Sequence, residues 1–181
     1  MKRDAHATAA ARAEAGTAAA HAEAGTAAAR AEAGTADAAR VLVARVGSEY
    51  FAFPLADVLE AVDAPVVTTV PLTPTGVLGQ CTHRGQLLPV LDPHRLLGAP
   101  LDAGSGTVLI MAADSMPFAL QVDDVTDMVT IGPNDWRALP EGTDRTGMLA
   151  GLLAIDRMLV AAVEMTAFRA TAATLLTTGT R

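Results

Sequence analysis

The stretch that decides the fold is Phe51 to Val62, FAFPLADVLEAV, because its pattern returns from Phe118 to Val129 as FALQVDDVTDMV. Each copy has an aromatic residue followed by alanine, then apolar residues at intervals, an Asp-Val pair, an acidic residue and a final valine. An ordered series of matches over this distance indicates two related half-domains. The match continues in the same order, with 70–71, 77–79 and 87–92 corresponding to 139–140, 149–151 and 159–164.

Both halves are rich in short β-type runs. Runs of apolar and β-branched residues, separated by Gly and Pro, occupy 41–46, 50–55, 66–70, 87–91, 107–111, 118–122 and 158–163. Helix is favoured only over 92–97 and 164–176. Many short strands with turn signals between them are typical of an all-β sandwich or barrel. The sequence therefore predicts an all-β fold of two small barrels packed side by side, with short helices between them and at the C-terminus.

The N-terminal region differs from the rest of the chain. A nonapeptide of the form AAARAEAGT occurs three times in succession over residues 9–35, once with His in place of Arg. Each unit contains a glycine, which costs a helix about 1 kcal/mol, and no side chain large enough to pack. We therefore predict a low-complexity, disordered tail over residues 1–39, with a partner-binding helix as the alternative. The folded domain is expected over 40–170, and 171–181 is expected to be the end of the C-terminal helix and a short tail.

Composition and charge exclude several classes of partner. The formal net charge is −7, and most of the excess acidic residues follow the N-terminal tail. An acidic surface is repelled by phosphate, which argues against nucleic acid and against anionic membranes. Apolar stretches are too short to cross a bilayer, and no signal peptide is evident. Cys81 is the single cysteine, and we interpret it as a structural thiol. The sequence predicts a cytoplasmic protein without direct membrane insertion.

Catalytic motifs are missing from the sequence. It contains no phosphate-binding glycine loop, no nucleophile elbow and no paired-histidine metal spacing, and His83 and His94 are the only histidines after the tail. Asp57 and Asp124 occupy equivalent places in the two halves, where an aspartate typically caps the next turn. We therefore predict no catalytic residue, no cofactor and no metal. The alternative is a small β-barrel enzyme that uses Asp123, Asp124 and His94.

One segment has a pattern of its own, Gly76 to Asp92, GVLGQCTHRGQLLPVLD. Here an Arg84-Gly85 turn joins two apolar strands, whereas the second half has Asp156-Arg157 at the equivalent turn. A fixed turn of this kind presents a guanidinium, with its planar set of donors, to a partner surface. The simpler alternative is an arginine that is merely solvated. Because the two turns differ in charge, we expect the two halves to face different partners.

At this segment the chain resembles the CheW-like domain family, whose hallmark is the pattern G-x-x-N-L-R-G-x-x-x-P-V-x-D-L. The Asn-Leu pair of the pattern is replaced by Thr82-His83, and the final Leu by Pro93. The resemblance covers about residues 40–170, including the LQVDDVTDMV stretch. The residues that match the hallmark are Gly79, Arg84, Gly85, Pro89, Val90 and Asp92.

The resemblance implies two intertwined five-stranded barrels of SH3-like type and a scaffold without catalytic activity. Members of the family bind the cytoplasmic tip of a chemoreceptor (a methyl-accepting chemotaxis protein) and the regulatory domain of a CheA-type histidine kinase. The receptor tip lies in an apolar groove between the barrels. By position, that groove is expected to be lined or bordered by Arg84, His83, Gly85, Val58 and Val62. The alternative is a divergent module that binds only the kinase, as a spacer or inhibitor in a pilus-motility or developmental pathway.

Overall fold

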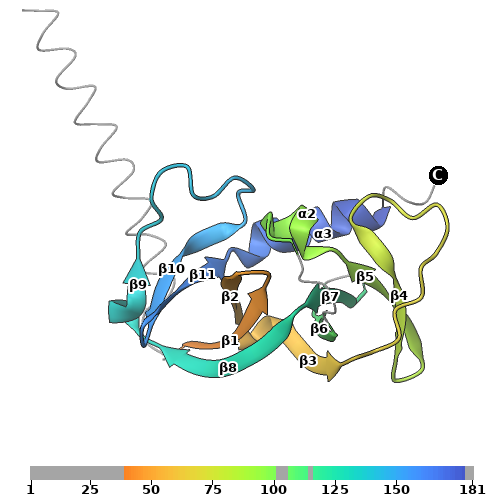
Figure 1. Ribbon diagram of the computed structural model, residues 1–181, viewed down its shortest axis with the longest axis horizontal. Helices are drawn as coiled ribbons and strands as arrows, with labels where there is room; N and C mark the ends of the chain where they lie inside the picture. The colour runs from red at the N-terminus through yellow and green to blue at the C-terminus, as the bar shows by residue number, and fades with distance from the viewer. Residues whose placement is uncertain (1–38, 101–105, 114–115, 178–181) are drawn as a thin grey trace, which may run out of the picture. The chain divides into compact units, whose positions relative to one another are not determined.

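The computed structural model describes residues 39–100, 106–113 and 116–177. The predicted tail therefore lies outside the described residues apart from Ala39, and the proposed domain boundaries remain predictions. Within the described part, no helix is long and apolar enough to span a membrane. These described residues form eleven strands and four short or medium helical segments, and Figure 1 labels the strands and the helices α2 and α3.

The strands are β1 (Ala39–Val46), β2 (Glu49–Pro54), β3 (Val58–Asp63), β4 (Val77–His83), β5 (Gln86–Leu91), β6 (Thr107–Met111), β7 (Phe118–Val122), β8 (Asp124–Ile131), β9 (Trp136–Arg137), β10 (Leu149–Ile155) and β11 (Met158–Val163). The helical segments are η1 (Leu55–Asp57), α2 (Pro93–Leu97), η2 (Pro133–Asp135) and α3 (Met165–Thr177). The predicted all-β class and both predicted helices are confirmed. The predicted strand over 66–70 is wrong, because only Thr68 forms a bridge there, to Gln80.

The strands form two sheets that exchange elements between the two halves of the repeat. One sheet has the order β8-β1-β2-β11-β10-β9, and the other has the order β3-β6-β7-β5-β4 (Figure 1). Each sheet thus takes its first hairpin from one half of the chain and its remaining strands from the other half. The barrels are intertwined, as the resemblance implies, although neither sheet closes through hydrogen bonds and the first has a sixth strand, β9. The two half-domains of the repeat are therefore not the two barrels.

The two sheets reproduce each other in register. Parallel pairing places Val90 of β5 opposite Ala119 of β7, and it places Ala162 of β11 opposite Ala52 of β2. These are equivalent positions in the two halves. A register shift also occurs where β3 pairs with β6, and a matching one occurs where β8 pairs with β1. The internal repeat of the sequence is thus a pseudo-twofold relation between the sheets.

The first strand of each hairpin is buried on both faces, which explains its unbroken apolar run. In β1, Val41 and Val43 pack inside the six-stranded sheet, whereas Leu42 and Ala44 face a larger core between the sheets. The five-stranded sheet has its own interior, which includes Cys81. The predicted structural thiol is confirmed, since Cys81 is buried and its burial raises the pKa of the thiol. Three apolar clusters therefore hold the fold together.

Helix α3 seals the core between the sheets. Phe168 is fully buried, and its ring centroid lies 6.0 Å from that of Phe53 and 6.2 Å from that of Phe118. These two rings belong to β2 and β7, the second strands of the two hairpins. Arg169 on the same helix donates to Asp57 at 2.8 Å. The helix is thereby fixed to both sheets, and Asp57 contacts α3 instead of capping the turn that follows it.

Candidate functional site

The β4–β5 turn has the backbone conformation that its sequence requires. Arg84 has φ of +49° and Gly85 has φ of +80°, so both central residues of the two-residue turn are in the left-handed region. Two positive φ values define a type I′ turn, whose twist matches the strands that it joins. The guanidinium does not extend freely into solvent: Arg84 Nη2 lies 2.5 Å from Glu60 Oε2 on β3. Arg84 is thus paired with Glu60 while its side chain stays mostly exposed, so its role toward a partner remains a prediction.

His83 joins the same cluster from the end of β4. Its Nε2 lies 3.4 Å from Glu60 Oε2, the oxygen that also accepts from Arg84. The side chain of His83 is largely buried, while that of Arg84 is mostly exposed. An exposed pair of this kind contributes at most about 1 kcal/mol to stability. Its main consequence is geometric, because it ties the end of the β4–β5 hairpin to β3, and β3 and β4 are the two edge strands of the five-stranded sheet.

A groove of about 450 Å³ lies between β3 and β8. These two strands are equivalent in the internal repeat, and each is an edge strand of a different sheet. Apolar side chains dominate it, and the two acidic residues Glu60 and Asp127 come from its two opposite strands. Leu59 and Met128 are large apolar side chains that remain more than half exposed here. The residues that line it are Leu42, Leu55, Val58, Leu59, Glu60, Ala61, Val125, Thr126, Asp127 and Met128.

The structure brings together only part of the predicted site. Val58 lines the groove, and Arg84 and His83 are connected to it through Glu60. Val62 instead packs against the interior of the five-stranded sheet. Gly85 shapes the turn and, like Arg84, His83 and Val62, does not line the groove itself.

Sequence reasoning missed the contribution of β8 to the groove. Val125, Asp127 and Met128 lie on that strand, opposite the residues of β3. The internal repeat carried the signal, because Val58 and Val125 are equivalent residues of the two copies. Only the exchange of strands between the sheets makes these equivalent segments face one another across one groove.

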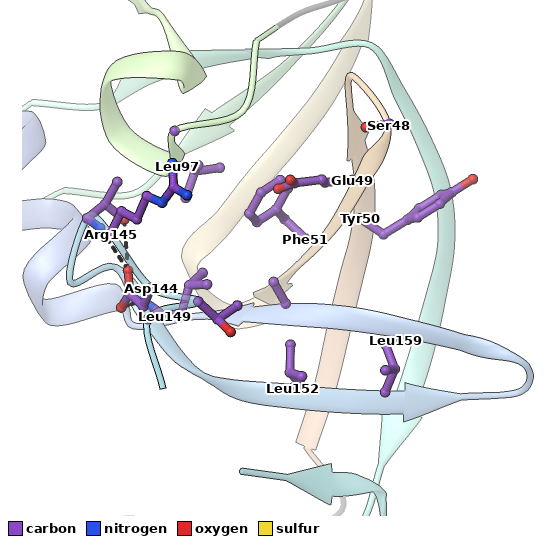
Figure 2. A pocket seen from close by; sticks show the side chains of 15 residues that line it. Ser48, Glu49, Tyr50, Phe51, Leu97, Asp144, Arg145, Leu149, Leu152 and Leu159 are labelled. Carbon is purple, nitrogen blue, oxygen red and sulfur yellow. Dashed lines mark hydrogen bonds between the residues drawn. The ribbon is translucent and has the colours of Figure 1, made fainter. Parts of the chain in front are cut away.

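A second cavity of about 570 Å³ lies on the six-stranded sheet, beneath the loop before β10 (Figure 2). Leu152 and Leu159 extend from β10 and β11 on one side, and Asp144 and Arg145 lie on the loop (Figure 2). None of the predicted site residues lines this cavity. Tyr50 from β2 is a further lining residue.

Asp144 holds that loop in shape. Its Oδ1 accepts from the backbone N–H of Thr146 at 2.9 Å and of Gly147 at 2.7 Å, and its Oδ2 accepts from Leu149 N–H at 3.0 Å. Partial burial raises the pKa of this carboxyl, but the hydrogen bonds to the charged form outweigh burial and leave the pKa below its usual value. The carboxylate is thus a structural anchor for the loop.

The residues of the alternative enzyme hypothesis have separate structural positions. Asp123 is almost completely buried and accepts from Gly47 N–H at 2.5 Å, which ties β7 to the β1–β2 turn. Asp124 is exposed at the start of β8. His94 lies in the first turn of α2, where its N–H donates to Asp92 at 2.9 Å. Neither cavity is lined by any of the three, and the described residues contain no cluster able to hold a metal.

Two intertwined barrel-like sheets with an apolar groove between their edge strands define a class of small double-barrel binding domains. The chain belongs to the CheW-like domain family, since the family model described as CheW-like domain matches residues 40–168. It is 32% identical over 133 residues to the probable chemotaxis protein CheW of Rhizobium etli, covering 71% of this chain and 86% of that protein. It is 31% identical over 136 residues to the chemotaxis protein CheW of Rhizobium meliloti, with the same coverage of both chains.

A solved structure supports the fold. The crystal structure of the scaffolding protein TtCheW from Thermoanaerobacter tengcongensis matches with a TM-score of 0.62, covering 71% of this chain and 90% of that one. The two sequences are 23% identical over this match. The similarity therefore concerns the arrangement of the strands, and it agrees with the double-barrel architecture described above.

Proposed function

We propose that this chain is a non-enzymatic adaptor that couples a chemoreceptor to a CheA-type histidine kinase. The observation that carries the proposal is the apolar groove between β3 and β8, in a fold whose relatives are named chemotaxis proteins. The cytoplasmic tip of the receptor, a helical hairpin, occupies the groove. The regulatory domain of the kinase binds elsewhere on the barrels. The protein then works in the cytoplasm and reaches membrane receptor arrays only through its partners.

The groove suits a helix as its ligand. An amphipathic helix that lies in a groove buries one apolar face, which requires apolar side chains on both walls. Leu59 on β3 and Met128 on β8 supply them and are more than half exposed without a partner. Because each is already partly buried, covering the remainder contributes roughly half of the about 1.5–3 kcal/mol that burial of a fully exposed side chain would give. Affinity therefore comes mainly from these contacts, and an array of many receptors multiplies modest affinities through avidity.

The ion cluster at the β4–β5 turn positions one wall of the groove. Arg84 and His83 hold Glu60, and through it they tie the hairpin to β3, on which Val58 lies. Gly85 gives the turn its shape, and Val62 fixes β3 to the interior of its sheet. In this proposal Val58 contacts the receptor, whereas the other four predicted residues position or border the groove.

The experiment is a binding assay with purified partners, namely a soluble cytoplasmic fragment of the chemoreceptor and the kinase regulatory domain. The full chain is compared with Arg84→Glu, which places a second carboxylate beside Glu60. The matched control is Arg157→Glu, a substitution of the arginine at the corresponding turn of the other sheet. We expect Arg84→Glu to lose the receptor fragment and to keep the kinase domain, and the control to keep both. Binding of the kinase domain alone by the unaltered chain would contradict the coupling function and assign the narrower role of a spacer or inhibitor.

A further inference from the structure

Two acidic residues occupy equivalent positions on the two walls of the groove. Glu60 lies on β3 and Asp127 on β8, and both line the groove. Their strands pair in the same register, with Glu60 opposite Ile110 of β6 and Asp127 opposite Val43 of β1. The pseudo-twofold relation between the sheets therefore gives both carboxylates the same local backbone setting.

The two carboxylates differ in what the chain provides for them. Glu60 has two basic partners, Arg84 and His83. Asp127 accepts from the N–H of Met128 at 2.7 Å through Oδ1, and it forms no ion pair with any residue that the structure describes. Its side chain is exposed at the surface. One wall of the groove thus has a carboxylate with two basic partners, and the opposite wall has a carboxylate without a basic partner among the described residues.

The two hairpin turns differ at three equivalent positions, with Ile155, Asp156 and Arg157 in place of His83, Arg84 and Gly85. The residue equivalent to Arg84 is Asp156, which has nearly the same backbone conformation, with φ of +52° against +49°. The next residue differs, because Gly85 has φ of +80° whereas Arg157 is not in the left-handed region. The β10–β11 turn thus differs in shape from the β4–β5 turn, and it carries Asp156-Arg157 where the other carries Arg84-Gly85. Asp156 cannot form with Asp127 the ion pair that Arg84 forms with Glu60, and among the described residues Arg157 forms no ion pair with Asp127 either. The difference leaves Asp127 available to a cation from outside the chain.

We propose that the receptor helix in this groove supplies a lysine or arginine that pairs with Asp127; this inference rests on the proposed function. A docked helix removes water from the groove, and a carboxylate that loses water without a partner costs binding energy. A basic residue beside the apolar face of the helix offsets that cost and fixes which way the helix lies. The partner is therefore an amphipathic helix that carries a basic residue on the side that faces β8. It needs no basic residue for Glu60, which already pairs with Arg84 and His83.

The test compares Asp127→Asn with Asp124→Asn by calorimetric titration of the soluble receptor fragment into the full chain. Asparagine keeps the oxygen that accepts from Met128, so the fold is preserved and only the charge is lost. Asp124 is an exposed carboxylate of the same strand that does not line the groove, which makes it the matched control. We expect Asp127→Asn to bind about 3- to 10-fold more weakly at low ionic strength, a difference that shrinks in concentrated salt, with the control unchanged.

A second variant, Asp156→Arg, places an arginine at the position of the six-stranded sheet that is equivalent to Arg84 in the other sheet. An arginine there is expected to compete with the receptor for Asp127, and we expect this variant to weaken receptor binding by no more than Asp127→Asn does. Equal affinities for Asp127→Asn, Asp124→Asn and the unaltered chain would overturn the inference and leave the proposed function intact. If the unaltered chain does not bind the receptor fragment at all, the proposed function fails, and the inference fails with it.

Discussion

Replacing Phe168 by alanine tests the packing that joins the two sheets. The side chain is fully buried, and its ring contacts the rings of Phe53 and Phe118 from the two hairpins. Truncating a buried phenylalanine costs about 3–5 kcal/mol. Loss of each aromatic pair adds about 0.5–1.5 kcal/mol beyond the buried area. We therefore expect a loss of unfolding free energy at the upper end of that range, about 4–5 kcal/mol.

The assay is urea unfolding followed by circular dichroism, which yields the free energy of unfolding and its dependence on denaturant. Because a loss of this size is comparable with the whole stability of many domains, Phe168→Leu provides a milder variant with an expected cost of about 1–2 kcal/mol. Thr166→Ala, on an exposed position of the same helix, is the control and is expected to change little. A cost below about 1 kcal/mol for Phe168→Ala would refute the view that α3 seals the core between the sheets.

Three further predictions concern single sites. Gly79→Ala is expected to lose about 1–3 kcal/mol of stability, because a Cβ there would overlap the carbonyl oxygen of Thr68. The check is a thermal melt beside that of Gly106→Ala, where a Cβ has room. Since the pKa of Asp144 is lowered in the folded state, its contribution to stability is present above the unfolded pKa and is lost as pH falls through the folded pKa. Below about pH 4, the free energy of unfolding should therefore fall less steeply with pH in Asp144→Asn than in the unaltered chain. Equal dependence of the unfolding free energy on pH in the two proteins would exclude the stabilising role. Met128→Glu is expected to weaken receptor binding roughly 10-fold or more while leaving the melting temperature nearly unchanged, and unchanged affinity in a calorimetric titration would contradict the role of β8 in the groove.

The sequence was sufficient for the class of fold, but not for the pairing of its strands. Periodicity and turn residues identify most strands, and the repeat of Phe51 to Val62 at Phe118 to Val129 identifies two related halves. A period-two pattern does not say which strand is the neighbour of which, because equivalent hairpins of the two halves offer equally apolar surfaces. The exchange of hairpins between the sheets was implied only by the resemblance to the CheW-like domain family.

The predicted strand over 66–70 failed for a local reason. The segment is apolar and β-branched, but Pro65 and Pro71 border it and cannot donate to a ladder. Its single bridge, between Thr68 and Gln80, crosses the edge of β4 at the place where Gly79 leaves room. Val66 is 82% exposed, and Val67 alone of these two valines packs against the interior of the five-stranded sheet. Composition indicated a strand, but the segment forms only one antiparallel bridge to β4.

The candidate site was predictable on one wall only. Val58 was predicted from its position in the family pattern. Leu59 and Met128 were not predicted, because they belong to no motif and alternate along their strands with residues that face the other way. The contact of Arg84 with Glu60 joins residues far apart in the sequence and depends on how β3 lies beside the β4–β5 turn. Side-chain pairing of this kind follows from tertiary structure and leaves no local signal.

The most direct test of the adaptor function is a nuclear magnetic resonance titration of the isotope-labelled chain with the receptor fragment, repeated with the kinase regulatory domain already bound. We expect the receptor fragment to shift the amide signals of 58–61 on β3 and 125–128 on β8 in both titrations. We expect the kinase domain to perturb other surfaces and to stay bound. Receptor shifts confined to a different face, or release of the kinase domain on addition of the receptor fragment, would contradict the claim that this chain couples the two through the groove.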